Sequence, residues 1–251
     1  MRYNIKLHLA YDGSSYFGWQ KTQEGPSVEE TLETVLTTIL QEPVELQAAS
    51  RTDAGVHAED QVVNFYTSKN LSATNRWLTS MNSLLPEDIR VYAMQIMPLS
   101  FHPTLESLGK EYHYHVSTTP WLSPFQRHFM WHFPKKLELE LMQKASLHLL
   151  GKKDFSALTN TRKPDYENRV REIFSIDITQ EGENFCFRIR GDHFLYKMVR
   201  NIVGTLCYVG CGKLSIDAIE KILESKQRAQ AGMTAPACGL VLKKVYYPED
   251  V

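Results

Sequence analysis

A short polar loop, SRTDAGVH at residues 50–57, separates two apolar stretches of this sequence. The flanking residues 43–49 and 60–67 are rich in apolar side chains and predict two strands. Asp53 lies in the loop and is followed by Ala54 and Gly55, whose small side chains allow another molecule to approach the backbone closely. The stretch therefore predicts a strand-loop-strand unit that presents one carboxylate.

Two interpretations of Asp53 are open at this stage. The side chain can cap its own loop, as in an Asx turn, or it can serve chemistry. Arg51 lies two residues before it and could pair either with Asp53 or with a phosphate group. Residue type and spacing alone do not choose between these interpretations.

Strands and helices alternate on both sides of this loop. An alternating apolar pattern predicts a strand at 2–10, and a capping box at Ser27 and Glu30 predicts the start of a helix. The apolar stripe of that helix runs from Val28 to Ile39. The other elements predicted in this half are a helix at 72–84, ending before Pro86, and a strand at 89–97.

The second half has a similar mixture of elements. Predicted strands lie at 110–118, 171–180, 184–190 and 239–247, and predicted helices at 137–150, 193–209 and 215–225. Residues 119–136 and 159–169 predict irregular segments, and the dipeptide Glu181-Gly182 predicts a hairpin turn. Frequent hairpins among interspersed helices indicate an α+β fold with a mainly antiparallel sheet. We expect two halves, residues 1–105 and 106–251.

The predicted helix at 193–209 carries a cationic stripe. Three basic residues and a glycine follow each other at steps of four, three and four, so they are expected on one face of the helix: His193, Lys197, Arg200 and Gly204. The apolar residues occupy the opposite face: Leu195, Met198, Ile202, Leu206 and Val209. This stripe either lines an anion-binding cleft or forms an ordinary solvated surface.

The predicted strand at 110–118 places two tyrosines on one face and two histidines on the other. Tyr112 and Tyr114 are either core residues or, in an RNA enzyme, a platform for an unpaired base. His113 and His115 could chelate a metal or simply pack, and the sequence shows no third ligand beside them. Phosphate-loop, nucleophile-elbow and His-Glu-x-x-His motifs are absent from the sequence.

Composition excludes little. The chain has 251 residues, a net charge of −1 and a pI of about 6.8, which gives no basic excess of the kind common in nucleic-acid-binding proteins. No apolar run reaches the roughly 20 residues of a membrane helix, and the N-terminus reads as a strand rather than a signal peptide, so we expect a cytoplasmic protein without membrane contact. Its four cysteines contain no Cys-x-x-Cys pair; Cys207 and Cys211 are either buried thiols or a metal-binding pair.

The chain resembles the TruA family of tRNA pseudouridine synthases over essentially its whole length. Five stretches carry the resemblance, in the order of the family and at compatible separations: 11–20 (YDGSSYFGWQ), 51–58 (RTDAGVHA), 110–112 (KEY), 198–204 (MVRNIVG) and 235–240 (APACGL). The resemblance implies two halves with ferredoxin-like or RRM-like folds that form one continuous sheet flanked by helices, with the active site in a cleft between them. It implies isomerisation of uridine to pseudouridine in the anticodon stem-loop of tRNA, at positions 38–40, by a homodimer that needs no metal or organic cofactor.

The same resemblance implies roles for individual residues. Asp53 matches the catalytic aspartate, and Arg200 matches the basic residue paired with it. Tyr112 matches the tyrosine that stacks on the target base, and Arg51 matches the arginine that helps to hold the target nucleotide out of the helix. Whether Asp53 attacks C1′, attacks C6 or removes a sugar proton stays open.

The chain departs from the family pattern in three places, one of which is Leu108-Gly109, in a segment that usually has another sequence. Ser50 stands where glycine is usual, and Pro103-Thr104 stands where the family usually has Ala-Arg. Two other functions were weighed. One is a non-catalytic tRNA-binding or RNA-folding module on the same scaffold, and the other is a metal-dependent hydrolase that uses His113 and His115.

Overall fold

The computed structural model describes residues 2–160 and 168–248. The chain forms two compact units. Unit 1 comprises Met1–Leu108 together with Val241–Val251, and unit 2 comprises Gly109–Leu240. The sequence analysis placed the end of the chain with the second half, but residues 241 and 242 pair with strand β3 of unit 1, so that end belongs to unit 1.

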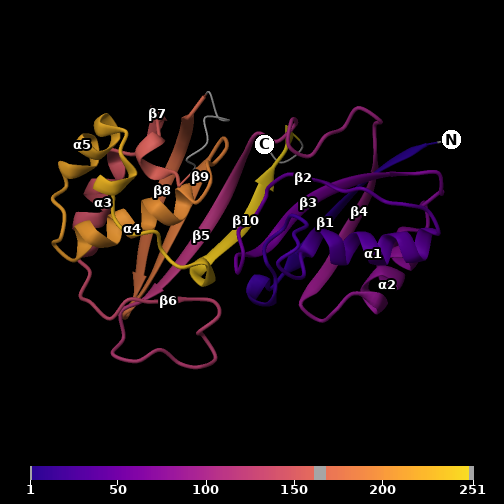
Figure 1. The fold of residues 1–251 in the computed structure, drawn as a ribbon, viewed down its shortest axis with the longest axis horizontal. Coiled ribbons are helices and arrows are strands. Elements are labelled where there is room, and N and C mark those ends of the chain that lie inside the picture. Colours follow the sequence, from indigo (N-terminus) through magenta and orange to yellow (C-terminus); the bar gives the residue numbers. More distant parts are fainter. Residues whose placement is uncertain (1, 161–167, 249–251) are drawn as a thin grey trace. The chain divides into compact units, whose positions relative to one another are not determined.

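Unit 1 has a split β-α-β topology (Figure 1). The order β4-β1-β3 is antiparallel throughout, β2 adds to β3 in the same sense, and β10 adds to β3 in parallel. This strand order, with helices between the first and second strands and between the third and fourth, is the ferredoxin-like arrangement. Its elements are β1 (Tyr3–Tyr11), η1 (Gly13–Ser15), α1 (Val28–Leu40), β2 (Gln47–Ala48), β3 (His57–Thr67), α2 (Thr74–Leu84), β4 (Ile89–Met97) and β10 (Leu240–Tyr246).

Helices cover one face of the unit 1 sheet, and side chains from outside the helices bury part of the other. Helices α1 and α2 lie side by side on one face (Figure 1), and α1 begins where Ser27 accepts a hydrogen bond from the backbone N–H of Glu30. On β1, Lys6 is only 2% exposed, with its ammonium 4.1 Å from the ring centroid of Tyr247. The ring of Phe101 lies on the same side, 5.4 Å from that ammonium, so a cation-π contact stabilises a charge inside the unit.

Unit 2 contains an antiparallel sheet in the order β5-β9-β8-β7, and β6 pairs with β5 in parallel. Helices α3 and α4 cover one face of β8 and β9 (Figure 1). The elements of unit 2 are β5 (Gly109–Ser117), β6 (Trp131–His132), α3 (Leu139–Leu147), β7 (Gly151–Asp154), η2 (Ser156–Leu158), β8 (Val170–Glu181), β9 (Asn184–Gly191), α4 (Met198–Gly210), α5 (Ala218–Ser225), η3 (Arg228–Gln230) and η4 (Ala237–Gly239).

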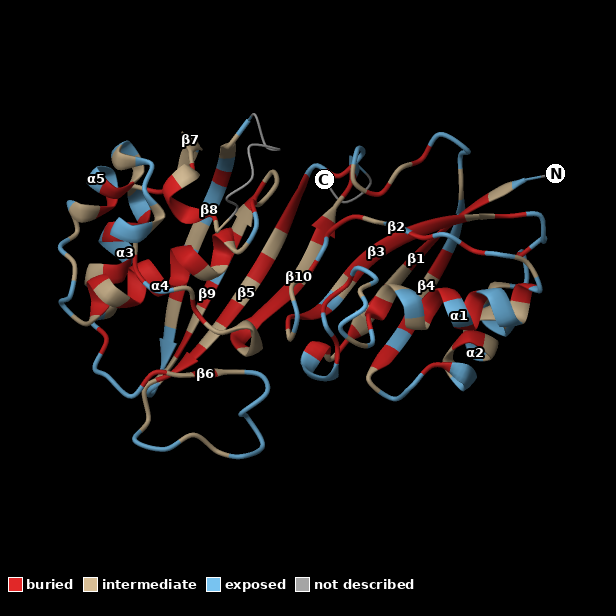
Figure 2. Cartoon of the chain, in the orientation of Figure 1, coloured by how far each residue is buried: buried red, intermediate tan, exposed pale blue. Residues whose placement is uncertain are grey.

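The α+β class and the mainly antiparallel pairing are confirmed, as is the turn at Gly182, where φ is +59°. Strand β5 alternates buried and half-exposed residues as predicted (Figure 2). The predicted strand at 43–49 is reduced to β2, and β7 was not predicted because GKKD lacks an apolar pattern. Most of the predicted loop at 159–169 lies outside the described residues.

The prediction of a helix from residue 193 is wrong. Helix α4 begins at Met198, because Lys197 takes a left-handed conformation with φ of +59°. His193 and Lys197 therefore precede the helix, and helical spacing does not place them on one face with Arg200. Gly204 also has another reason to be small: a Cβ there would lie 1.8 Å from the carbonyl oxygen of Met233. No continuous cationic stripe runs along the described α4.

Candidate active site

The loop that carries Asp53 is a tight turn closed by backbone groups. The N–H of Val56 donates to the carbonyl oxygen of Asp53 at 3.1 Å, and Gly55 within the turn has φ of +75°. The N–H of Gly55 donates to the carbonyl oxygen of Tyr16 at 3.2 Å. An Asx turn would use the N–H of Gly55 as its donor, and this N–H bonds with Tyr16 instead.

Residues 11–19 form a cradle around this loop, and the sequence analysis gave them no role. The hydroxyl of Tyr11 bonds with that of Thr52 at 2.7 Å, and the N–H of Trp19 donates to the carbonyl oxygen of Thr52 at 3.0 Å. Gly18 packs so closely that an added Cβ would lie 2.7 Å from that same oxygen. The backbone on both sides of Asp53 is therefore fixed by a segment far away in the sequence.

The other end of the loop is held by Gln61 on β3. Its side-chain amide donates to the carbonyl oxygen of Ser50 at 2.6 Å and accepts from the N–H of Ser50 at 3.2 Å. Ser50 is not among the residues with positive φ. Serine in place of the family's usual glycine therefore costs no backbone strain here.

The predicted site residues divide between the units. Asp53, which is half-buried, and Arg51, which is exposed, lie in unit 1. Tyr112 on β5 and Arg200 in the first turn of α4 lie in unit 2. Each unit thus carries two of the four residues.

Tyr112 is a largely buried residue, with 6% of its surface exposed. Its ring meets that of Phe194 edge to face, with centroids 5.2 Å apart. Tyr114, two residues on, donates from its hydroxyl to the carbonyl oxygen of Pro236 at 2.7 Å. Burial raises the pKa of Tyr114 well above its ordinary value, so Tyr114 stays a neutral hydrogen-bond donor.

Arg200 is anchored to the segment that follows α5. Its Nε donates to the carbonyl oxygen of Ala235 at 2.7 Å, and the N–H of Ala235 donates to the carbonyl oxygen of Arg200 at 3.1 Å. These reciprocal bonds fix the guanidinium relative to the start of α4. The guanidinium also lowers the pKa of Cys238, although burial outweighs this effect and raises that pKa overall.

A buried polar network behind Arg200 was missed by the sequence analysis. The side chain of Asn201 is fully buried and donates to the carbonyl oxygen of Leu158 at 2.9 Å and to Oδ1 of Asn160 at 2.8 Å. It accepts from Arg228 at 2.9 Å and from the hydroxyl of Thr234 at 2.7 Å. The network ties α4 to two distant segments, so Asn201 positions the helix that carries Arg200.

Known proteins are similar to this chain over most of its length. A family model described as tRNA pseudouridine synthase matches residues 8–104 and 145–248. The chain is similar to a protein of Protochlamydia amoebophila (strain UWE25) named tRNA pseudouridine synthase A 2, with 50% identity over 97% of this chain and 94% of that relative. It is also similar to tRNA pseudouridine synthase A of Acetivibrio thermocellus, with 41% identity over 97% of this chain and 99% of that relative.

The chain belongs to the tRNA pseudouridine synthase family. It is therefore an isomerase that acts on uridine in tRNA, and tRNA is its substrate. Family membership overturns both alternatives weighed from the sequence, the non-catalytic RNA module and the metal-dependent hydrolase. No helix among the described residues is long and apolar enough to cross a membrane.

The departure of this pseudouridine synthase at Pro103-Thr104 has a structural role in unit 1. The carbonyl oxygen of Pro103 accepts from the hydroxyl of the buried Tyr247 at 2.7 Å. The hydroxyl of Thr104 donates to the carbonyl oxygen of Ala48 on β2 at 2.7 Å. Residue 104 therefore secures β2 through its side chain.

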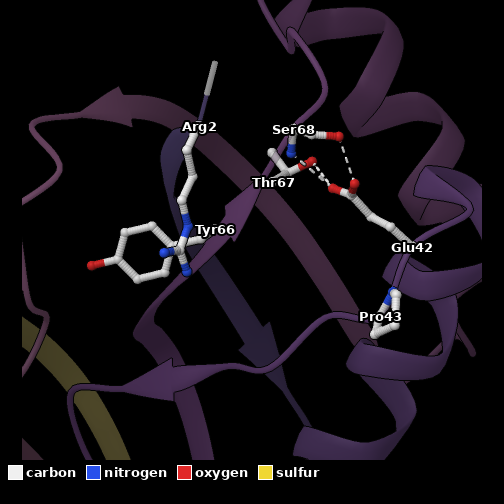
Figure 3. Close-up of a pocket in the computed structure, with 6 residues that line it drawn as sticks. All are labelled: Arg2, Glu42, Pro43, Tyr66, Thr67 and Ser68. Atoms are coloured by element: carbon white, nitrogen blue, oxygen red, sulfur yellow. Dashed lines mark hydrogen bonds between the residues drawn. The ribbon is translucent and has the colours of Figure 1, made fainter.

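One surface pocket of unit 1 contains none of the predicted site residues (Figure 3). The guanidinium of Arg2 lies 4.2 Å from the ring centroid of Tyr66. Glu42 accepts hydrogen bonds from Thr67 and Ser68, and these bonds lower the pKa of Glu42. Because these polar groups bond with each other, the pocket adds nothing to the site of this synthase.

Proposed function

We propose that this pseudouridine synthase acts on the anticodon arm of tRNA, at positions 38–40, with Asp53 as its catalytic carboxylate. The observation that carries the proposal is the turn at Asp53. Backbone bonds and the cradle of residues 11–19 close and fix the turn that carries Asp53. A carboxylate on a loop that is held rigidly is what precise chemistry on a bound nucleoside requires.

The reaction breaks the N1–C1′ glycosidic bond, turns the uracil, forms a C5–C1′ bond and releases the C5 proton. N1 takes up one proton while C5 releases one, so no atom is gained or lost overall and one carboxylate can act without an external reagent. The target base must first leave the helix, which costs a few kcal/mol. The role proposed for Arg51 is to offset that cost by occupying the space that the nucleotide leaves, and its exposed side chain supports this role.

The proposal gives Tyr112 the role of stacking on the base and gives Arg200 the role of pairing with Asp53. Arg200 is suited to its role because Ala235 and the Asn201 network restrict its movement. Tyr112 exposes only 6% of its surface, so contact with a base would use a limited part of its ring. The proposal also includes a homodimer as the form that binds tRNA.

The test is Asp53→Asn, measured in single-turnover reactions on an anticodon stem-loop RNA and on full tRNA. The amide is nearly isosteric, so we expect affinity for tRNA to change by no more than a few-fold while pseudouridine formation is lost. Glu59→Gln is the matched control, because Glu59 is an exposed carboxylate of the same unit that pairs with Lys243. An Asp53→Asn rate above about a tenth of the wild-type rate would remove Asp53 from catalysis.

A further inference from the structure

The open face of the unit 2 sheet gathers three metal-binding side chains. His113 and His115 are two apart on β5 and point to the same face, and Cys186 lies directly opposite His115 on β9. One donor atom from each residue lies within 4.8 Å of the others. Among the described residues, no other group of three His, Cys, Asp or Glu side chains meets this condition. The third ligand that the sequence did not reveal comes from the neighbouring strand.

A carboxylate supports this cluster from the same strand. Nε2 of His113 lies 2.7 Å from Oε1 of Glu111. When a carboxylate accepts the N–H of one ring nitrogen, the other nitrogen keeps the lone pair that a metal binds, and this arrangement is common around metal-bound histidines. His113 and Glu111 are 16% and 21% exposed, so the cluster is shielded but an ion can still reach it.

Two arginines of β9 oppose metal binding, because Arg188 lies opposite His113 and Arg190 lies opposite Glu111. The guanidinium of Arg188 is 3.1 Å from Oδ2 of Asp177 on β8. Glu111 and a Cys186 thiolate would together supply two negative charges at the cluster. These charges attract a divalent ion, while the charge of Arg190 opposes it.

We propose that His113, His115 and Cys186 bind one Zn²⁺ ion that joins β5 to β9. A thiolate with two imidazoles suits a borderline-soft ion that accepts tetrahedral geometry, and three protein ligands leave the fourth position to water. The site lies on the face of β5 opposite Tyr112, so the ion is structural and takes no part in the isomerisation. Its effect is to fix the pairing of the strand that carries Tyr112.

The test uses untagged full-length protein, stripped of metal and kept reduced with a phosphine. Co²⁺ is the spectroscopic probe, because a cobalt–thiolate bond gives a near-ultraviolet charge-transfer band. We expect a band that saturates at one Co²⁺ per chain and that Zn²⁺ then removes. Zn²⁺ at a hundred times its Kd should also raise the Tm by roughly 5 °C or more.

Three variants separate this site from other metal binding. Cys186→Ser should abolish the band and His115→Gln should weaken Co²⁺ affinity at least about tenfold, each with the metal-free Tm of the wild type. Cys211→Ser is the control, because Cys211 is another half-buried thiol of unit 2, and it should keep the full band. The absence of a thiolate band in the wild type, or an undiminished band in Cys186→Ser, would overturn the proposal.

Discussion

Gly18 is the residue through which the cradle of residues 11–19 can be tested most directly. Its φ is +97°, and a Cβ added to it would lie 2.7 Å from the carbonyl oxygen of Thr52 and 3.1 Å from the carbonyl carbon of Asp53. Both contacts are with backbone atoms of the catalytic loop proposed above. Gly18→Ala should therefore displace that loop without altering any side chain in it.

The expected loss of stability and the expected loss of kcat/KM have separate causes. A residue other than glycine in a left-handed conformation loses about 1–2 kcal/mol, which corresponds to a Tm decrease of a few degrees in a protein of this size. Ordinary van der Waals contact begins at 3.4 Å, so the Thr52 oxygen must move by about 0.7 Å. Because a misplacement near 1 Å can reduce catalysis about a hundredfold, we expect kcat/KM to fall on the order of 10- to 100-fold.

Gly151→Ala is the matched control for the loss of stability. Gly151 has φ of +81° and no atom within 4 Å of an added Cβ, so the substitution should lower Tm and leave kcat/KM unchanged. Thermal unfolding followed by circular dichroism gives Tm, and tRNA modification under kcat/KM conditions gives the rate. If Gly18→Ala retains the kcat/KM of Gly151→Ala, the cradle does not determine the position of Asp53.

Three further predictions concern unit 2. Tyr112→Phe should keep near wild-type kcat/KM in the tRNA assay. Tyr112→Ala should lower kcat/KM roughly 5- to 150-fold, because base–aromatic stacking is worth about 1–3 kcal/mol. An alanine variant with a lower Tm but an unchanged kcat/KM would instead assign Tyr112 to the core. Asn201→Leu should lower Tm by several degrees, since it removes the side-chain hydrogen bonds of the buried Asn201, and a buried group left unsatisfied costs about 1–3 kcal/mol; an unchanged Tm would contradict this. Burial lowers the pKa of Lys110 to about 8. Between pH 8 and pH 10.5 the unfolded chain therefore binds one more proton than the folded protein, so the free energy of unfolding rises with pH across this window. Lys110→Met should therefore raise the free energy of unfolding by up to about 3 kcal/mol at pH 7. Its higher Tm relative to the wild type should disappear as the pH approaches 10.5. A difference in Tm that does not depend on pH would exclude the buried charge of Lys110 as its cause.

Local signals in the sequence determined the elements that depend on local physics. Ser27 caps α1 as its capping box predicts, because the bond from the N–H of Glu30 spans only three residues. The hairpin at Gly182 forms because glycine readily adopts positive φ. The alternation in β5, which separates Tyr112 from His113, follows from the two-residue period of any strand.

Only the tertiary structure decided where α4 begins and why Gly204 is small. The pattern from residue 193 is compatible with a helix, but Lys197 adopts a left-handed conformation and the helix starts one residue later. Gly204 permits the close approach of the carbonyl oxygen of Met233, a residue 29 positions away. Spacing along one helix contains no information about such a neighbour.

The surroundings of the proposed site residues were also decided by tertiary contacts. The sequence alone pointed to Asp53 and Arg200, through residue type and family resemblance. The contacts of Gly18 with the loop of Asp53, of Asn201 with Arg228, and of His115 with Cys186 join segments 27 to 71 residues apart. Such contacts depend on strand register and on the packing of loops against helices, which are set by the whole chain and not by any local stretch of it.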